Sequence, residues 1–316
     1  MTPGEIHTAV VFGGAGFIGS HLVPALEGRG AAVTVADIRE PAFRAPHAYV
    51  DVRHPIDLEL DRAPDLVVNL AAVHRSPGHQ SHEYYETNVR GAIEVTEWSR
   101  RAGAPTIVFT SSIAVYGPGE NARTEASPCA PDTPYGHAKL LAERVHTAWA
   151  GSTGGRAVVV RPASIFGRGS TGNFARLAAA LRSGRFVYPG RTDTVKSCGY
   201  VRDLVDAVCF LLDRDELGTG AWNFGYPDAY TVQDVCEALC AIGGFARPRR
   251  VPERALAPIV LAARKGWGPE LVQQVHKART STNVAPAALR GLGYRWPTDL
   301  VGGLDAWAKE SDGAFT

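Results

Sequence analysis

The residues best suited to proton transfer are Tyr135 and Lys139, which lie four positions apart just after Thr133 and Pro134. Threonine suits a helix N-cap and proline suits the first helical position, so we expect a helix to begin here. Side chains four positions apart share one face of a helix and reach a common site. A phenol has a pKa near 10, and a neighbouring ammonium group favours its ionised form. The pair predicts that Tyr135 is a base, removing a proton from a hydroxyl group while hydride leaves the same carbon.

Ser111 and Ser112 complete this arrangement, because they follow an apolar run, Thr106–Thr110, that predicts a strand. The Ser112 hydroxyl can hydrogen-bond the same substrate oxygen and stabilise charge as alcohol and carbonyl interconvert. A tyrosine and a lysine at this spacing are also common on ordinary helix surfaces. The serines at the strand end favour catalysis over simple packing.

A glycine turn lies near the start of the chain, where Gly13, Gly16 and Gly19 follow the apolar run Thr8–Phe12 and precede a helix-like stretch, His21–Glu27. Glycines there allow a tight turn, close approach to a pyrophosphate and close packing of helix on strand. The helix N-terminus offers free N–H groups to the phosphates. Glycine turns without a nucleotide are also common, so this motif alone indicates only a candidate dinucleotide site.

A second apolar run, Ala32–Ala36, ends in Asp37, close to the distance at which this fingerprint places an acidic residue. A carboxylate there accepts hydrogen bonds from the adenine ribose and repels a 2′-phosphate, which favours NAD over NADP. Arg39 could pair with a 2′-phosphate, so NADP remains an alternative. The alternative is a solvated turn in which Asp37 is a turn residue and Arg39 a surface charge.

Apolar runs alternate with helix-like segments in the first half of the chain. Further strands are expected at residues 66–70, 106–110 and 157–160, and helices at residues 84–101 and 134–149. This alternation predicts an α/β fold with a Rossmann-type doubly wound parallel sheet, whose ligands bind beyond the carboxyl ends of the strands. We expect a cofactor domain in residues 1–165, with returning segments near 198–225, and a smaller C-terminal α/β substrate lobe mainly in residues 166–316.

The composition argues against several other classes of protein. The 316 residues include 33 basic and 32 acidic ones, and no basic stripe suggests a nucleic-acid partner. The five cysteines are scattered and no histidine cluster completes a metal site. The first residues lack a signal-peptide pattern, and the apolar stretch around residues 256–263 is too short to span a bilayer. We therefore expect a cytoplasmic protein with no metal and no membrane partner.

Taken together, the motifs resemble those of the extended short-chain dehydrogenases/reductases, in the group of NAD-dependent nucleotide-sugar epimerases and dehydratases. The resemblance covers nearly the whole chain and follows its order. It comprises the glycine turn, Asp37, Asp51-Val52, Asn69–Ala72, Asn88 with Gly91, Ser111–Gly117, Tyr135 with Lys139, Arg161-Pro162, Tyr200–Leu204 and Trp222–Gly225.

This resemblance implies that Ser112, Tyr135 and Lys139 are the catalytic residues and that Lys139 also holds the nicotinamide ribose. It implies NAD as the cofactor. The residues expected to bind it are Gly13, Gly16, Phe17, Ile18, Gly19, Asp37, Arg39, Asp51, Val52, Leu70, Ala71, Ala72, Asn88, Tyr135, Lys139 and Pro162.

Two departures from the family pattern narrow the reaction. Relatives that eliminate water carry an acidic pair directly after the catalytic hydroxyl, and relatives that decarboxylate a uronic sugar carry Glu at the second of these positions. Here the positions hold Ile113 and Ala114, which transfer no proton. The resemblance then implies epimerisation of a nucleotide-diphosphate sugar, with C4 the expected carbon. An NAD(P)H-dependent reductase of a keto-sugar and a non-catalytic NAD-binding sensor or scaffold are the alternatives.

The expected substrate contacts are less specific than the cofactor motif. Ser164 stands where many relatives have Asn, and Lys196 stands where they often have Arg for the substrate phosphates. The residues expected at the substrate are His74, Arg75, His79, Ser111, Ser112, Ser164, Lys196 and Arg202. An ordinary solvated loop would explain the histidines equally well. The resemblance also implies a homodimer, formed through the helices at 84–101 and 134–149.

Overall fold

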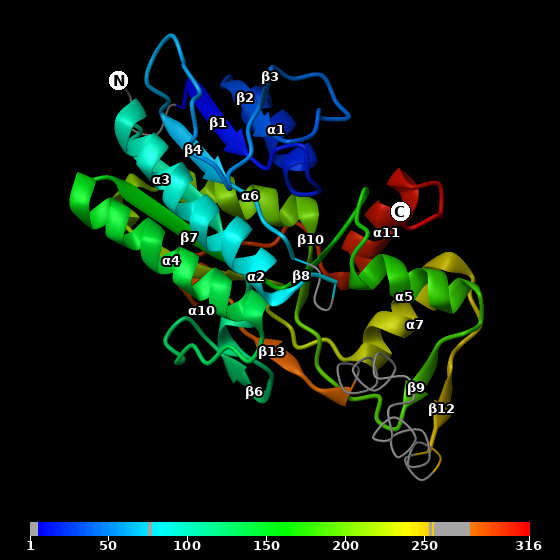
Figure 1. Ribbon diagram of the computed structural model, residues 1–316. Helices are drawn as coiled ribbons and strands as arrows, with labels where there is room; N and C mark the ends of the chain where they lie inside the picture. Colours follow the sequence, from blue (N-terminus) through cyan, green and yellow to red (C-terminus); the bar gives the residue numbers. More distant parts are fainter. Residues whose placement is uncertain (1–5, 75–77, 253–254, 256–278) are drawn as a thin grey trace. The chain divides into compact units, whose positions relative to one another are not determined.

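The computed structural model of the protein describes residues 6–74, 78–252, 255 and 279–316. A central sheet of seven strands has the order β11-β7-β5-β4-β1-β2-β3, and every neighbouring pair in it is parallel (Figure 1). The strands are β1 (Thr8–Phe12), β2 (Ala32–Asp37), β3 (His47–Tyr49), β4 (Leu66–Asn69), β5 (Thr106–Thr110), β7 (Arg156–Pro162) and β11 (Gly220–Phe224). The expected Rossmann-type sheet is confirmed.

Near-continuous apolar runs form these strands because a parallel sheet is buried on both faces. Side chains such as Val11, Phe12, Val68 and Val160 are 2% exposed or less. Helix α3 (Gly91–Ala102) and helix α4 (Pro134–Thr153) lie side by side over one face of the sheet (Figure 1). The other helices joining or covering these strands are α1 (Gly19–Gly28), α2 (Ser81–Tyr84) and α6 (Val201–Leu212).

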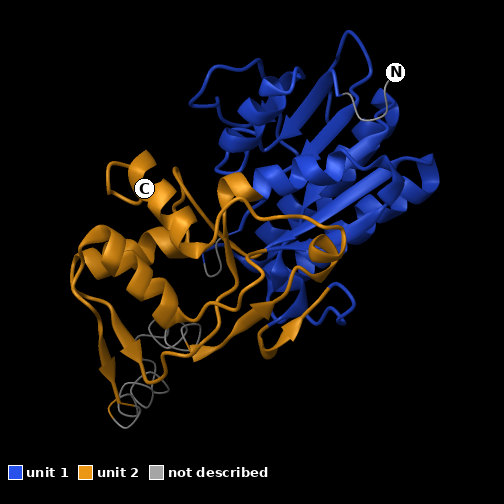
Figure 2. Ribbon diagram, turned by 180° about the vertical axis from the view of Figure 1, so that it is seen from behind, with its two compact units in different colours: residues 1–117, 125–162, 204–224 blue, residues 118–124, 163–203, 225–316 orange. Residues whose placement is uncertain are grey.

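The chain forms two compact units (Figure 2). Unit 1 contains the central sheet and comprises the described residues within 1–117, 125–162 and 204–224. Unit 2 comprises the described residues within 118–124, 163–203 and 225–316. Strand β11 returns to the sheet of unit 1 after a long excursion and pairs with β7.

Unit 2 contains three short parallel pairs, β8 with β10, β9 with β12 and β6 with β13. Its strands are β6 (Gly119–Arg123), β8 (Ser164–Phe166), β9 (Val187–Pro189), β10 (Cys198–Tyr200), β12 (Arg249–Val251) and β13 (Thr282–Val284). Its described helices include α5 (Asn173–Arg182), α7 (Val232–Gly243), α10 (Ala287–Gly291) and α11 (Leu300–Glu310). Thr231 caps α7, since its side chain accepts a hydrogen bond from the Asp234 N–H.

The helix expected at residues 84–101 is divided into three parts in the structure. The α2 helix ends at Tyr84, a π-helical segment η1 covers Tyr85–Arg90, and α3 begins at Gly91. Wide turns of this kind often occur at functional sites because they redirect a side chain. Within the described residues, no helix combines the length and the apolar character needed to cross a membrane.

Candidate active site

Helix α4 begins as expected and carries Tyr135 and Lys139 on one face. The Thr133 hydroxyl oxygen accepts a hydrogen bond from the Gly136 N–H at 3.1 Å, and Pro134 occupies the first turn. Ser112 lies at the end of β5, where its hydroxyl caps a short 3₁₀ turn, Ile113–Tyr116, by accepting from the Ala114 N–H at 3.1 Å. Tyr135 and Ser112 also share a side-chain hydrogen bond. The structure therefore brings the hydroxyl groups of the expected catalytic residues together.

Burial outweighs the expected effect of the Lys139 ammonium group on the pKa of Tyr135. Burial raises the pKa of Tyr135 to about 12, and the hydrogen bond with Ser112 opposes this shift. The Lys139 Nζ atom donates to the Thr110 carbonyl oxygen at 2.8 Å and makes no hydrogen bond to the Tyr135 hydroxyl among the described contacts. The Tyr135 ring instead has the Tyr84 ring beside it, with 6.1 Å between centroids. Tyr135 is protonated at neutral pH in this arrangement, so a further positive charge is needed for it to act as a base.

Lys139 is a buried lysine with neutral partners close to its ammonium group. It is 2% exposed, and its Nζ atom lies 4.8 Å from the centroid of the Phe109 ring. Burial lowers the pKa of Lys139 to about 7, while the carboxylate of Glu143 opposes this effect. Lysines whose pKa is moved this far by burial are typical of functional sites.

A charged network lies one turn further along α4. Arg161, on β7, donates from Nε and from a terminal nitrogen to the two oxygens of Glu143, at 2.9 and 2.6 Å. The other terminal nitrogen of Arg161 donates to the Tyr116 hydroxyl at 2.6 Å, and this hydroxyl donates to Asn223 at 2.9 Å. The Ser111 hydroxyl donates to Glu143. All five side chains are buried, so this network links β5, α4, β7 and β11.

A second polar chain connects α4 to the loop after β4. His146 is fully buried, stacks on Phe109 with 4.2 Å between ring centroids, and has its Nδ1 atom 2.8 Å from the Ala142 carbonyl oxygen. A carbonyl oxygen only accepts, so Nδ1 carries the proton and Nε2 accepts from the Asn69 amide, 3.3 Å away. The Asn69 amide oxygen accepts in turn from the Ala71 N–H at 3.2 Å. His146 thereby fixes a loop expected to bind the cofactor.

The glycine turn fits a dinucleotide phosphate. Gly13 has a φ of +74°, and a Cβ atom there would lie 2.5 Å from the Ala71 nitrogen; at Gly19 it would lie 2.2 Å from the Gly14 carbonyl oxygen. At Gly16, by contrast, such an atom would meet the Gly13 carbonyl oxygen at 3.2 Å and no other described atom within 4 Å. The turn is therefore close-packed on its protein side and open at Gly16, beside the start of α1, where a phosphate can approach the backbone.

Asp37 supports the glycine turn directly. Its carboxylate is buried and accepts from the Ala15 N–H at 3.1 Å and from the Arg39 N–H at 3.0 Å. The Arg39 side chain is 70% exposed, and its Nε atom lies 4.0 Å from the Asp37 carboxylate. The Asp37 carboxylate at this position suits the ribose hydroxyl groups of NAD and would repel the 2′-phosphate of NADP.

Other expected cofactor residues are held by packing and local hydrogen bonds. Asn88, on η1, accepts from the Val73 N–H at 2.9 Å and donates to the Val73 carbonyl oxygen at 3.1 Å, which anchors the loop after β4. Val52 packs so closely on Gly91 that a Cβ atom there would lie 2.8 Å from it. Asp51 is paired with Arg53, whose hydrogen bonds lower the pKa of the Asp51 carboxyl group. The remaining expected residues, Phe17, Ile18, Leu70, Ala72 and Pro162, also belong to unit 1.

The expected substrate residues are distributed over both units. Ser111 donates its hydroxyl to Glu143 inside the buried network, which indicates a supporting role instead of substrate contact. His79 pairs with Glu83 at 3.1 Å, His74 is exposed, and Arg75 lies outside the described residues.

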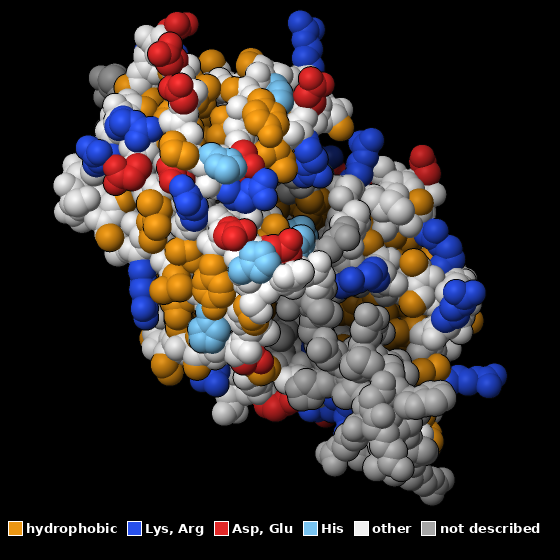
Figure 3. Space-filling view, viewed as in Figure 1, with side chains coloured by type: hydrophobic (Ala, Val, Ile, Leu, Met, Phe, Trp, Pro, Cys, Tyr) orange, Lys and Arg blue, Asp and Glu red, His pale blue; other side chains and the backbone are white. Residues whose placement is uncertain are grey.

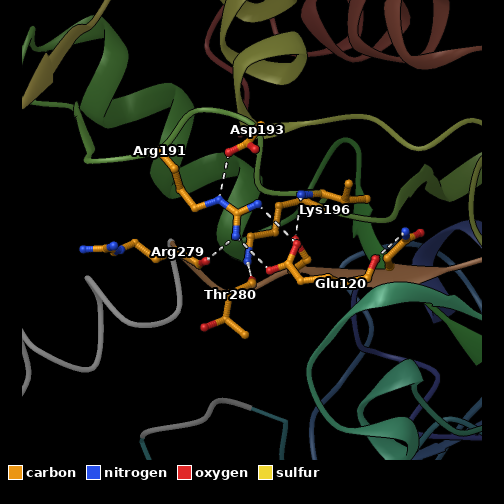
Figure 4. Close-up of polar contacts among 9 residues, drawn as sticks. Glu120, Arg191, Asp193, Lys196, Arg279 and Thr280 are labelled. Atoms are coloured by element: carbon orange, nitrogen blue, oxygen red, sulfur yellow. Dashed lines mark hydrogen bonds and ion pairs between the residues drawn. The ribbon is translucent and has the colours of Figure 1, made fainter. Parts of the chain in front are cut away.

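In unit 2, Ser164 begins β8, and Arg202 pairs with Glu310 at 2.6 Å. The Lys196 Nζ atom donates to the Thr280 carbonyl oxygen (Figure 4). These residues are thus tied to unit 2 by their own contacts, and they stay predictions as substrate ligands.

Sequence reasoning missed Glu143, His146, Tyr116 and Asn223 as site residues. Glu143 follows Lys139 by four positions, and His146 follows Lys139 by seven, so both lie on the helix face that carries the catalytic lysine. That spacing is the signal that could have identified them. Tyr116 and Asn223 lie within the motifs Ser111–Gly117 and Trp222–Gly225, but only the fold brings their side chains into contact.

Comparison with known proteins agrees with this geometry. An N-acetyl-alpha-D-glucosaminyl-diphospho-ditrans,octacis-undecaprenol 4-epimerase from Escherichia coli O157:H7 is 30% identical over 238 residues, covering 72% of this chain and 70% of that protein. A UDP-glucose 4-epimerase from Azospirillum brasilense is 27% identical, covering 88% of this chain and 86% of that protein.

Solved structures share the fold. That of UDP-glucose 4-epimerase from Brucella ovis in complex with NAD has a TM-score of 0.76 at 23% identity, covering 97% of this chain and 98% of that one. The sequence profile of the NAD dependent epimerase/dehydratase family matches residues 9–225. The chain therefore belongs to the NAD dependent epimerase/dehydratase family, within the extended short-chain dehydrogenases/reductases, and is an enzyme of that family whose cofactor is NAD.

Proposed function

We propose that this enzyme epimerises a nucleotide-diphosphate sugar at C4, with Ser112, Tyr135 and Lys139 as its catalytic residues. The observation that carries the proposal is the set of side chains around Ser112. Tyr135 provides a proton-transfer group there, whereas the next two residues, Ile113 and Ala114, have no group that could protonate a departing hydroxyl. Elimination and decarboxylation therefore lack the acidic group that they need. The reaction that fits these side chains is removal and return of hydrogen at one carbon.

In the proposed reaction, Tyr135 takes the proton of the C4 hydroxyl group and later gives it back. Ser112 donates a hydrogen bond to the same oxygen and stabilises the charge that develops on it. Bound NAD would supply reversible hydride transfer at that carbon. Burial raises the pKa of the Tyr135 phenol to about 12, and the positive charge of a bound oxidised nicotinamide would oppose this shift and favour the ionised phenol.

The first test is turnover without added reduced cofactor. Purified protein is mixed with UDP-, GDP- and dTDP-linked sugars, and the products are resolved by chromatography. An epimerase converts one of these sugars to an equilibrium mixture of C4 epimers. Consumption of added NADH or NADPH with a keto-sugar alone would identify a reductase, and bound NAD without any turnover would identify a sensor.

A second substrate class has support from one relative. The undecaprenyl-diphosphate sugar epimerase of Escherichia coli O157:H7 shares 30% identity with this chain, and its substrate name also contains a diphosphate-linked sugar. The turnover assay therefore includes N-acetylglucosamine on a polyprenyl diphosphate, presented in detergent. If the enzyme converts this compound and none of the nucleotide sugars, its substrate is a sugar linked to a lipid diphosphate and not to a nucleotide.

The role of Tyr135 predicts the result of a single substitution. Tyr135→Phe should lower kcat by about 10²- to 10⁴-fold, because the proton-transfer group is removed, while bound NAD measured by absorbance is unchanged. Tyr85→Phe, at a tyrosine that is 39% exposed on η1, is the matched control and should keep its turnover. Near-normal turnover in the Tyr135 variant would refute the mechanism.

We also propose that the enzyme is a homodimer through α3 and α4. Apolar side chains gather over these helices (Figure 3), and the exposed ones include Ile93 at 45%, Tyr85 at 39% and Leu141 at 38%. Apolar groups on two adjacent helices suit a self-complementary contact. Analytical ultracentrifugation should give a dimer for the natural protein and a monomer for Ile93→Glu/Leu141→Glu, and a natural monomer at micromolar concentration would contradict this.

A further inference from the structure

The buried face of α4 carries an unusual concentration of ionisable groups. Lys139, Glu143 and His146 are 2%, 6% and 0% exposed, at spacings of four and three residues. A charge taken out of water is costly unless a partner compensates it. The hydrogen-bond and ion-pair partners of each side chain therefore indicate which of the three is charged in the folded protein.

The Glu143 carboxylate is surrounded by donors. Arg161 makes a two-pronged contact with both of its oxygens, at 2.9 and 2.6 Å, and the Ser111 hydroxyl donates to one of them. Arg161 is held from its other side by the Tyr116 hydroxyl at 2.6 Å. This fork-to-fork geometry fixes the position of the carboxylate as well as its charge.

The Lys139 ammonium is placed differently. Its nearest partners are the Thr110 carbonyl oxygen at 2.8 Å and the face of the Phe109 ring at 4.8 Å, both of which favour a cation without neutralising it. Thr110 and Ser111 are consecutive residues at the end of β5, so the Lys139 and Glu143 side chains reach neighbouring points of one strand end. One carboxylate thus lies among two buried cations, Lys139 and Arg161.

We propose that Glu143 is a positioning residue for the reaction, the counter-ion that keeps the buried Lys139 ammonium charged while Arg161 and Ser111 hold its carboxylate in place. This inference rests on the role proposed above for Lys139. The Arg161–Glu143 ion pair then has two functions: it joins β7 to α4, and it fixes the carboxylate near Lys139. Glu143, held in place by Arg161, puts a carboxylate one turn from the catalytic lysine.

The surrounding groups are consistent with this assignment. Burial lowers the pKa of Lys139 to about 7 and Glu143 acts against it, so the charge on Lys139 depends on a second group near neutral pH. His146 contributes no charge there, because burial lowers its pKa to about 4. The titratable or charged side chains that face this cluster from the neighbouring elements are Tyr84, Tyr116, Cys129, Tyr135 and Arg161.

A direct measurement of the Lys139 charge tests the proposal without relying on turnover. The chain contains five lysines, so protein grown on lysine labelled with ¹³C at Cε gives a small set of NMR signals, and Lys139→Arg assigns the relevant one. In Glu143→Gln the pKa of Lys139 should fall by about one unit or more, since an opposite charge at close range shifts a pKa by about one to three units. An unchanged pKa in this folded variant would overturn the proposal.

Tyr116→Phe is the matched control. It loosens the Arg161 side of the network and leaves the Glu143 charge in place, so the Lys139 signal should titrate as in the natural protein. If this variant lowers the pKa of Lys139 as much as Glu143→Gln does, general loosening is the cause and the assignment of Glu143 fails.

Arg161→Gln guards against a Glu143→Gln variant that does not fold. It frees the carboxylate from its competing cation, so the pKa of Lys139 should rise, and a fall or no change would contradict the proposal. Turnover provides a separate readout: in Glu143→Gln the alkaline limb of kcat should move to lower pH. Complete absence of turnover in the natural protein on every sugar would refute the proposed function, while the NMR result would still decide the role of Glu143.

Discussion

Two arginine-centred networks, one in each unit, have nearly the same geometry and very different surroundings. In unit 1, Arg161 binds Glu143 at 2.6 Å with side chains that are 9% and 8% exposed. In unit 2, Arg191 binds Glu120 and Asp193 at 2.8 Å each, and the three side chains are 29%, 57% and 74% exposed (Figure 4). Distances alone would rank the two networks as equals. The difference lies in burial. The buried Arg161 network can influence the charge of a nearby group, whereas the exposed Arg191 network only holds surface residues together.

The same contrast applies to two lysines that both donate to a backbone carbonyl oxygen. Lys139 donates to Thr110 and Lys196 to Thr280. Burial moves the pKa of Lys139 to about 7, so its charge responds to its neighbours near neutral pH. Position in the core, and not the type of contact, gives a lysine this sensitivity.

The largest effect expected from this comparison concerns the stability of the buried network. Arg161→Gln should lower the free energy of unfolding by about 3–5 kcal/mol, because it removes the cation that binds both oxygens of the buried Glu143 carboxylate. Urea unfolding followed by fluorescence measures this loss. A loss below about 1 kcal/mol would show that the two networks are alike after all.

A smaller effect is expected from the neutral histidine beside the network. Burial lowers the pKa of His146 to about 4 in the folded protein. Between pH 6.5 and 4, the imidazole is therefore protonated in the unfolded chain and neutral in the folded protein. Stability is therefore fully present above pH 6.5 and is lost towards pH 4, by up to about 3 kcal/mol. Unfolding measured across this range should show the loss in the natural protein.

The control for that pH dependence is His146→Gln, which can still accept from the Asn69 amide but does not titrate. Its free energy of unfolding should fall less steeply between pH 6.5 and 4. Equal slopes for the two proteins would mean that other groups cause the acid sensitivity.

The smallest effect is expected at the exposed network. Arg191→Gln should change the free energy of unfolding far less than Arg161→Gln does, because ion pairs close to water are weak and are screened by salt. Comparison of urea unfolding at low and high salt checks this, and the small difference should disappear at high salt. A salt-independent loss as large as that of Arg161→Gln would remove the distinction between the networks.

Much of the sheet follows from local sequence. The run Thr106–Thr110 became β5 without change, and Thr133 and Pro134 start α4 as expected. Capping and continuous apolar runs are local signals, so one sequence is enough to recognise them. The glycine turn is equally local, and the close approach at Gly13 explains why its residues are glycine.

The parts that were not predicted depend on contacts between distant residues. Asn88 redirects the chain into a π-turn by holding both backbone groups of Val73, which no periodicity in residues 84–101 indicates. Glu143 meets Arg161 because α4 packs on β7, and the upward pKa shift of Tyr135 reflects the burial that results from the same packing. Desolvation is a property of the folded surroundings, so the residue types alone do not reveal how strongly burial raises the pKa of Tyr135.

The return of β11 to the central sheet has a practical consequence for dividing the protein. Unit 1 is not a continuous stretch of chain, because residues 204–224 complete it after residues 163–203 of unit 2 have intervened. A fragment ending at residue 162 would retain β7 but lose its neighbour, exposing a long apolar strand edge that is prone to pair with other chains. A cut at residue 162 therefore gives an incomplete unit 1 and not an exchangeable module.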